Sequence, residues 1–155
     1  MIRSILILAA LLASGCAGPG SLVGRPEADL RANLGAPTAE YVNRDGSRTL
    51  AYRQGAFGTQ TYMAEVSPSG SIGAVRQAMG EETFVRIVPG MTGDEVLRLI
   101  GPPGDSMDFP RQWEVSWEYR FVDTWGYPSL FFVNLDRRGV VVSKFTRRID
   151  RIDRH

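Results

Sequence analysis

Two segments of the chain share one pattern: Gly24-Arg25-Pro26-Glu27-Ala28-Asp29-Leu30-Arg31-Ala32-Asn33-Leu34-Gly35-Ala36-Pro37 and, further along, Gly90-Met91-Thr92-Gly93-Asp94-Glu95-Val96-Leu97-Arg98-Leu99-Ile100-Gly101-Pro102-Pro103. A glycine, acidic residues, a spaced pair of aliphatic residues, a second glycine and a proline occur in the same order in both. Recurrence at a fixed spacing indicates an internal repeat, in which each copy forms the same small structural unit.

Each copy of the pattern predicts a short helix. Pro26 or Thr92 begins the helix, and the acids in its first turn stabilise the positive end of the helix dipole. Aliphatic residues four positions apart, such as Val96 and Ile100, lie on one side of the helix. A glycine then ends the helix as a left-handed cap and a proline prevents its continuation, in the pairs Gly35 with Pro37 and Gly101 with Pro103.

Strand-like segments follow each predicted helix. In the first half they cover residues 49–53, 61–66 and 71–75, and in the second half residues 113–121, 130–135 and 140–145. Pro68-Ser69-Gly70 and Asp136-Arg137-Arg138-Gly139 have the composition of tight turns between antiparallel strands. Residues 81–86, between the halves, fit a short helix better than the alternative, an extended link.

The expected fold class is therefore α+β, with two small tandem units that each pack a short helix or helices on an antiparallel meander. We place the first unit at residues 22–79 and the second at residues 80–147. Residues 148–155 alternate in charge and are expected to form a charged, solvated tail.

The N-terminal residues predict a bacterial lipoprotein signal. Arg3 precedes the apolar run 5–13, which is too short to cross ~30 Å of hydrocarbon. Leu12-Ala13-Ser14-Gly15-Cys16 resembles a lipobox, in which the cysteine thiol is acylated and the chain is cut before it. We expect residues 1–15 to be removed and residues 16–21 to form a linker after the lipid-bearing Cys16. The alternative is a buried N-terminal helix.

The composition argues against an enzyme. Among the 155 residues, Lys+Arg number 18 and Asp+Glu number 17, so no strong field of one sign attracts nucleic acid. Cys16 is the only cysteine, and the only histidine is the terminal His155, so a multi-cysteine metal site is impossible and a histidine-dependent site would rest on a chain end. Apart from the lipid on Cys16, we predict no metal, cofactor or catalytic residue.

Aromatic residues are concentrated between residues 113 and 132. Period-two alternation assigns one set to the core face of a strand: Trp113, Val115, Trp117, Tyr119 and Phe121. Aromatic residues outside the core are the usual anchors of interfaces, and two lie in a predicted loop with Gly126 and Pro128. The predicted partner or lipid-headgroup surface therefore consists of Phe109, Arg111, Trp125 and Tyr127.

The second unit resembles the SmpA/OmlA, or BamE-type, lipoproteins. The resemblance rests on residues 88–103, which contain Gly90-Met91-Thr92, acids, aliphatic residues and Gly101-Pro102-Pro103. The strand Trp117-Glu118-Tyr119-Arg120-Phe121 and the turn at 136–139 follow in the family's order. The resemblance implies two helices on a small antiparallel sheet, and an address on the periplasmic face of a Gram-negative outer membrane.

The same resemblance implies a non-enzymatic accessory of outer-membrane β-barrel assembly and envelope integrity, with barrel-assembly components or other envelope proteins as partners. The tandem arrangement is also similar to β-lactamase inhibitor proteins, which pair two related helix-plus-sheet units. The alternative function is therefore a periplasmic binding or inhibitor module that captures a protein or ligand on its sheet.

Overall fold

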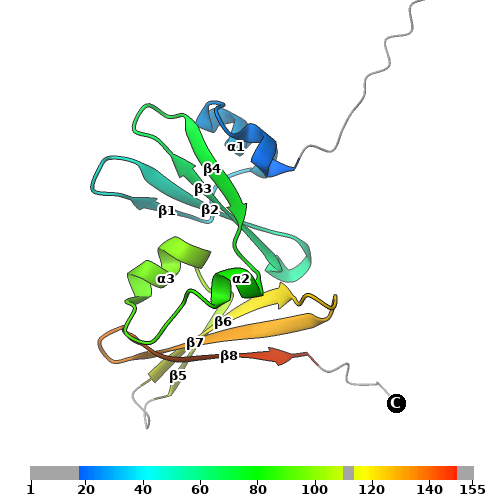
Figure 1. The fold of residues 1–155 in the computed structure, drawn as a ribbon, viewed down its shortest axis with the longest axis vertical. Coiled ribbons are helices and arrows are strands. Elements are labelled where there is room, and N and C mark those ends of the chain that lie inside the picture. The colour runs from blue at the N-terminus through cyan, green and yellow to red at the C-terminus, as the bar shows by residue number, and fades with distance from the viewer. Residues whose placement is uncertain (1–17, 110–113, 150–155) are drawn as a thin grey trace, which may run out of the picture.

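The computed structural model describes residues 18–109 and 114–149 (Figure 1). The first half contains, in order, the 3-10 turn η1 (Pro19–Leu22), α1 (Glu27–Leu34), β1 (Ala39–Val42), β2 (Arg48–Gln54), the 3-10 turn η2 (Ala56–Gly58), β3 (Gln60–Val66) and β4 (Ile72–Gln77). The second half contains α2 (Glu81–Phe84), α3 (Gly93–Ile100), β5 (Asp105–Phe109), β6 (Glu114–Val122), β7 (Pro128–Asp136) and β8 (Val141–Arg148).

The strands form two antiparallel meanders. Sheet 1 has the order β1-β2-β3-β4 and sheet 2 has the order β5-β6-β7-β8. Each sheet has a first strand that the sequence did not predict, β1 or β5. Both are short edge strands, and β5 is exposed along its whole length, so neither has an apolar run that would indicate a strand. The α+β class with two antiparallel sheets is confirmed at this level.

Both long helices begin and end near the predicted residues. Thr92 and Glu95 form a capping box at the start of α3, in which the Glu95 N–H donates to Thr92 Oγ1 at 3.3 Å. The predicted left-handed caps at Gly35 and Gly101 are wrong in detail. Their φ angles of 82° and 78° are positive, but ψ is −155° and −175°, a region that essentially only glycine adopts.

The repeat extends to individual backbone hydrogen bonds, which tie the start of each helix to the last hairpin of its own unit. The Gly24 N–H donates to the Ile72 carbonyl at 2.7 Å, and the Gly90 N–H donates to the Val141 carbonyl at 2.9 Å. A second equivalent pair of bonds joins Glu27 to Gly70 and Gly93 to Gly139. Each unit is thus a sheet with one helix anchored across its last two strands.

The layers alternate along the long axis as α1, sheet 1, α2 with α3, and sheet 2 (Figure 1). One core lies between α1 and sheet 1 and contains Leu22, Leu30, Leu50, Tyr52, Ala64, Val66 and Ile72. A larger core joins both units, because Ala51 and Met63 of sheet 1 pack with α2, α3 and the inner face of sheet 2. Sheet 1 is therefore covered on both faces and sheet 2 on one.

Three arginines fasten the units to each other. Arg53 of β2 donates to the carbonyls of Pro102 and Pro103 at 2.5 and 2.6 Å, just beyond the end of α3. Arg76 of β4 donates to the Leu99 carbonyl at 2.6 Å, and desolvation, with the nearby Arg86, lowers the pKa of Arg76. Arg98 of α3 donates in return to Asn43 Oδ1 at 2.7 Å. The bond from Arg76 satisfies a carbonyl in the last turn of α3 that has no helical partner, and the bonds from Arg53 satisfy two carbonyls just beyond the helix.

Candidate functional site

The described residues line a small cavity and an open groove. They contain no group of three or more His, Cys, Asp or Glu side chains that could hold a metal ion. A cavity of about 20 Å³ beside Arg53 and Tyr119 has room for about one water. An open groove of about 460 Å³ near Asn43 and Glu65 is lined mainly by polar residues at the end of sheet 1. In this part of the chain no helix has the length and hydropathy needed to span a bilayer.

The first candidate interaction surface is the outer face of sheet 2, which no other described element covers (Figure 1). Tyr119, Phe121 and Phe131 are buried on the inner face, so the residues between them on β6 and β7 point outward. The register places Glu118 beside Phe132 and Phe132 beside Phe145, and it places Leu130 between Arg120 and Arg147. We call Arg120, Leu130, Phe132, Phe145 and Arg147 the outer patch.

The outer patch has an aromatic centre with cations around it. The Phe132 and Phe145 rings stack with centroids 4.7 Å apart, and the Arg147 guanidinium lies 5.5 Å from the Phe132 centroid. Phe132 is only 4% exposed because its neighbours on the same face cover it, while Phe145 is 49% exposed. An exposed aromatic ring with arginine beside it is the composition found at the centres of protein interfaces.

The second candidate surface is the end of the molecule where β2 turns into β3 and β6 turns into β7. Five residues connect the strands in each hairpin, Gly55–Thr59 and Asp123–Tyr127, and the aromatic residue Phe57 or Trp125 stands third. A glycine with positive φ follows it in both loops, Gly58 at 71° and Gly126 at 84°. Phe57 is 86% exposed, Trp125 78% and Tyr127 54%. We call these three side chains the aromatic tips.

Asp123 fixes the conformation of the β6–β7 hairpin loop by accepting hydrogen bonds. Its Oδ1 accepts hydrogen bonds from the backbone N–H groups of Trp125 and Tyr127, both at 2.9 Å, and its Oδ2 accepts one from Arg148 at 2.7 Å. Desolvation alone would raise the pKa of Asp123, but these bonds outweigh it and lower the pKa. The Arg148 guanidinium also lies 4.5 Å from the Tyr127 ring centroid, so Tyr127 is fixed with one ring face against a cation.

The structure does not gather the predicted surface residues in one place. Phe109 pairs with Glu114 at the start of β6, whereas Trp125 and Tyr127 follow the end of that strand, so the length of β6 separates them. Cys16, Arg111 and Trp113 lie outside the described residues. The motif residues instead shape the helix ends: Gly24, Gly90, Met91 and Thr92 before α1 or α3, and Gly35, Pro37, Gly101 and Pro103 after them.

Sequence reasoning missed Phe57 and the outer patch. The Phe57-Gly58 pair repeats Trp125-Gly126 at the centre of a five-residue hairpin loop, and that signal was present in the repeat. Phe132 and Phe145 gave no such signal, because strands buried on the inner face also carry aromatic residues.

No protein-family model and no curated protein matches the chain. Among solved structures, the chain is similar to a candidate β-lactamase inhibitor protein from Streptococcus mutans. The two are 12% identical, the match covers 79% of this chain and 82% of the other, and the TM-score is 0.31. The resemblance to the SmpA/OmlA lipoproteins therefore stays a prediction.

Proposed function

We propose that the protein is a non-enzymatic lipoprotein of the Gram-negative outer membrane that supports outer-membrane protein assembly by binding an envelope protein on the outer patch. Lipid on Cys16 anchors it to the periplasmic face. One observation carries the binding part of the proposal. The face of sheet 1 that corresponds to the outer patch already receives a helical element inside this molecule, namely α3 of the second unit.

The two faces share a recognition residue. Arg53 and Arg120 each follow a tyrosine that points into the core of its own unit, Tyr52 or Tyr119. Arg53 donates to the carbonyls beyond the end of α3, whereas the side chain of Arg120 is 49% exposed and lies 3.9 Å from Glu118. Arg120 is therefore free to turn to the carbonyls at a partner's helix end, since a contact at 3.9 Å holds it weakly.

The apolar content also suits a docked helix. On sheet 1, Ala51 and Met63 lie under α3. On sheet 2, Phe145 is 49% exposed and offers its ring to a partner, whereas Leu130 and Phe132 on the same face are only 6% and 4% exposed and serve as its support. An envelope protein that presents an amphipathic helix would bury this area, as helix-in-groove complexes do.

The experiment is site-specific photo-crosslinking in the native membrane. A benzoylphenylalanine at position 145 lies in the outer patch, and the same residue at position 42, where Val42 is 64% exposed on β1, is the matched control. We expect position 145, and not position 42, to cross-link to a barrel-assembly component after detergent solubilisation. Arg120→Ala should weaken the cross-link several-fold, while Arg44→Ala should leave it unchanged.

Two outcomes contradict the proposal. If position 145 captures only soluble periplasmic enzymes, the inhibitor-module alternative replaces it. If palmitate labels the protein equally before and after Cys16→Ser, the lipid anchor is not on Cys16.

A further inference from the structure

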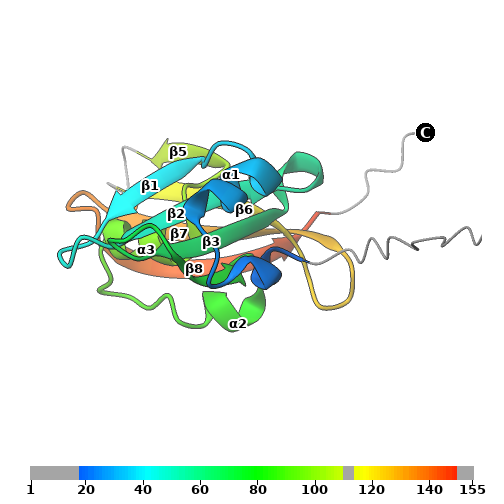
Figure 2. The ribbon, with the colours of Figure 1, turned by 90° about the horizontal axis from the view of Figure 1, so that it is seen from above.

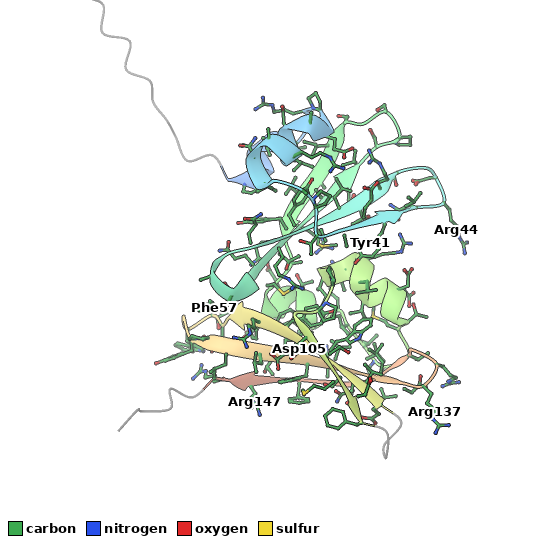
Figure 3. The ribbon with its side chains drawn as sticks, turned by 180° about the vertical axis from the view of Figure 1, so that it is seen from behind. Tyr41, Arg44, Phe57, Asp105, Arg137 and Arg147 are labelled. Atoms are coloured by element: carbon green, nitrogen blue, oxygen red, sulfur yellow. The ribbon has the colours of Figure 1, made fainter. Side chains whose placement is uncertain are left out.

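The start of the described chain and the aromatic tips lie on the same side of the molecule. Figures 1 and 2 place the β2–β3 hairpin, the β6–β7 hairpin and the end of β8 on the side from which the chain leaves η1. Figure 3 labels Phe57 on this side and Arg44 and Arg137 on the opposite side. Two elements far apart in sequence thus present exposed aromatic residues in the same direction.

We propose that this end is a bilayer-docking surface, on which Phe57, Trp125 and Tyr127 enter the headgroup region and fix the orientation of the body. The inference rests on the proposed lipid anchor at Cys16. Pro19, the first residue of η1, is three residues from Cys16, and an extended chain covers at most about 11 Å over that distance. A lipid on Cys16 therefore keeps η1, and the side of the molecule it lies on, next to the membrane.

Among the described residues, the aromatic side chains at the two ends differ in how far they are exposed. The opposite end is formed by the β1–β2, β3–β4 and β7–β8 connections, whose sequences are Asn43-Arg44-Asp45-Gly46-Ser47, Ser67-Pro68-Ser69-Gly70-Ser71 and Arg137-Arg138-Gly139-Val140. These three connections contain no aromatic residue, although Phe109, at the end of β5 on the same side, is 41% exposed. Tryptophan and tyrosine at the level of the headgroups are typical of proteins that contact a bilayer interface, because one part of the ring system is apolar and another is polar.

Phe57 and Trp125 are largely exposed, whereas the Tyr127 ring lies against Arg148. Phe57 has φ of 59° and is the only non-glycine with positive φ among the described residues, yet its ring is almost fully exposed. Val122 and Ile149, which flank the second hairpin, are also 49% and 42% exposed. Arg148 of β8 lies against the Tyr127 ring and bonds to Asp123, so one cation stands directly behind the tips. A lipid surface matches both the apolar tips and the cation behind them.

The test measures how deeply each end lies in the bilayer. Acylation consumes the only thiol of the chain, so a single new cysteine takes an environment-sensitive fluorophore. Lipidated protein with Phe57→Cys or Trp125→Cys is reconstituted in vesicles of phosphatidylcholine with phosphatidylglycerol, and Arg44→Cys is the matched control. We expect lipids with a quencher near the headgroup to quench the probes at 57 and 125 at least several-fold more strongly than the probe at 44.

The possible failures are distinguishable. Without palmitate incorporation and vesicle flotation, the lipid anchor itself fails. If the protein floats but the probes at 57 and 125 stay as unquenched as the probe at 44, the docking surface is wrong while the anchor stands. If lipids do not quench these probes and a photo-crosslinker placed at position 57 or 125 captures an envelope protein in native membranes, the tips bind protein and the docking surface is again wrong. All three positions are exposed, so these variants are expected to fold.

Discussion

Sheet 1 and sheet 2 have the same topology but different surroundings. Sheet 1 lies between α1 and the α2–α3 pair, whereas sheet 2 has helices on its inner face alone (Figure 1). The helices of the second unit thus cover one face of sheet 1, whereas no element of the described chain covers the outer face of sheet 2. On sheet 1 the face opposite α1 packs against α3, while no described element covers the corresponding face of sheet 2.

The first prediction tests whether the two units form one body. Ile100→Ala removes a fully buried side chain from the core that both sheets share and should lower the free energy of unfolding by about 2–5 kcal/mol. Leu30→Ala removes an equally buried side chain from the core above sheet 1 and should cost a similar amount. Both are measured by urea unfolding.

Two probes separate the units in that experiment. All three tryptophans belong to the second half of the chain, so their fluorescence reports the second unit, while far-UV circular dichroism reports both. We expect one shared transition for both probes in both variants. If Leu30→Ala shifts the dichroism and leaves the fluorescence midpoint unchanged, the units unfold separately and Arg53, Arg76 and Arg98 do not couple them.

The second prediction compares the glycines that end α1 and α3. Gly35→Ala forces a side chain into a backbone conformation that costs about 1–3 kcal/mol, with nothing within 4 Å of the new Cβ. Gly101→Ala carries the same strain, and its Cβ would also lie 3.2 Å from Ala51 Cβ and from Thr61 Cγ2 of sheet 1. It should therefore cost about 1 kcal/mol more by urea unfolding.

The difference between the stability lost in Gly101→Ala and that lost in Gly35→Ala measures how tightly the second unit packs on sheet 1. As a control, Ser69→Ala on an exposed turn should leave the free energy of unfolding nearly unchanged. Equal costs at Gly35 and Gly101 would mean that α3 can withdraw from sheet 1 without loss, which contradicts the close approach.

Local signals predicted the elements of each unit but not the way the units meet. The capping box at Thr92, the glycine and proline after each helix and the alternation through Trp117, Tyr119 and Phe121 act within a few residues, so the sequence shows them directly. The 3.6-residue spacing shows that α3 has an apolar side, but it does not show that sheet 1 packs on it together with sheet 2.

The missing parts of the prediction have the same cause. β1 and β5 are edge strands without an apolar run, and they form because a neighbouring strand pairs with them. Joining Phe57 to Trp125 and Tyr127 requires knowing that the two hairpins point to the same end, which depends on how the sheets stack. Conversely, Phe109 looked equivalent to Trp125 because only its residue type was visible, and its place at the other end of β6 was not.

The third prediction concerns a charge that only the first unit carries. Glu27 begins α1 and accepts hydrogen bonds from Arg48 and from Arg31, the latter at 2.9 Å, whereas the corresponding residue at the start of α3 is Gly93, beside Trp117. Partial desolvation raises the pKa of Glu27, but the two arginines outweigh it, so the pKa lies below its ordinary value of 4.5. The ion pairs bring the first turn of α1 to β2.

Because the pKa is lower in the folded state, the stability that Glu27 contributes is complete above about pH 4.5 and is lost as the pH falls through the lowered value. Glu27→Gln should therefore lower the unfolding free energy at pH 7 by at most about 1 kcal/mol, and wild type and variant should converge near pH 3. Glu82→Gln, which removes an exposed acid at the start of α2, should change stability less at pH 7. If both variants follow the same pH profile, α1 is held by apolar contacts alone, and the two helices differ only in what covers the far side of their sheets.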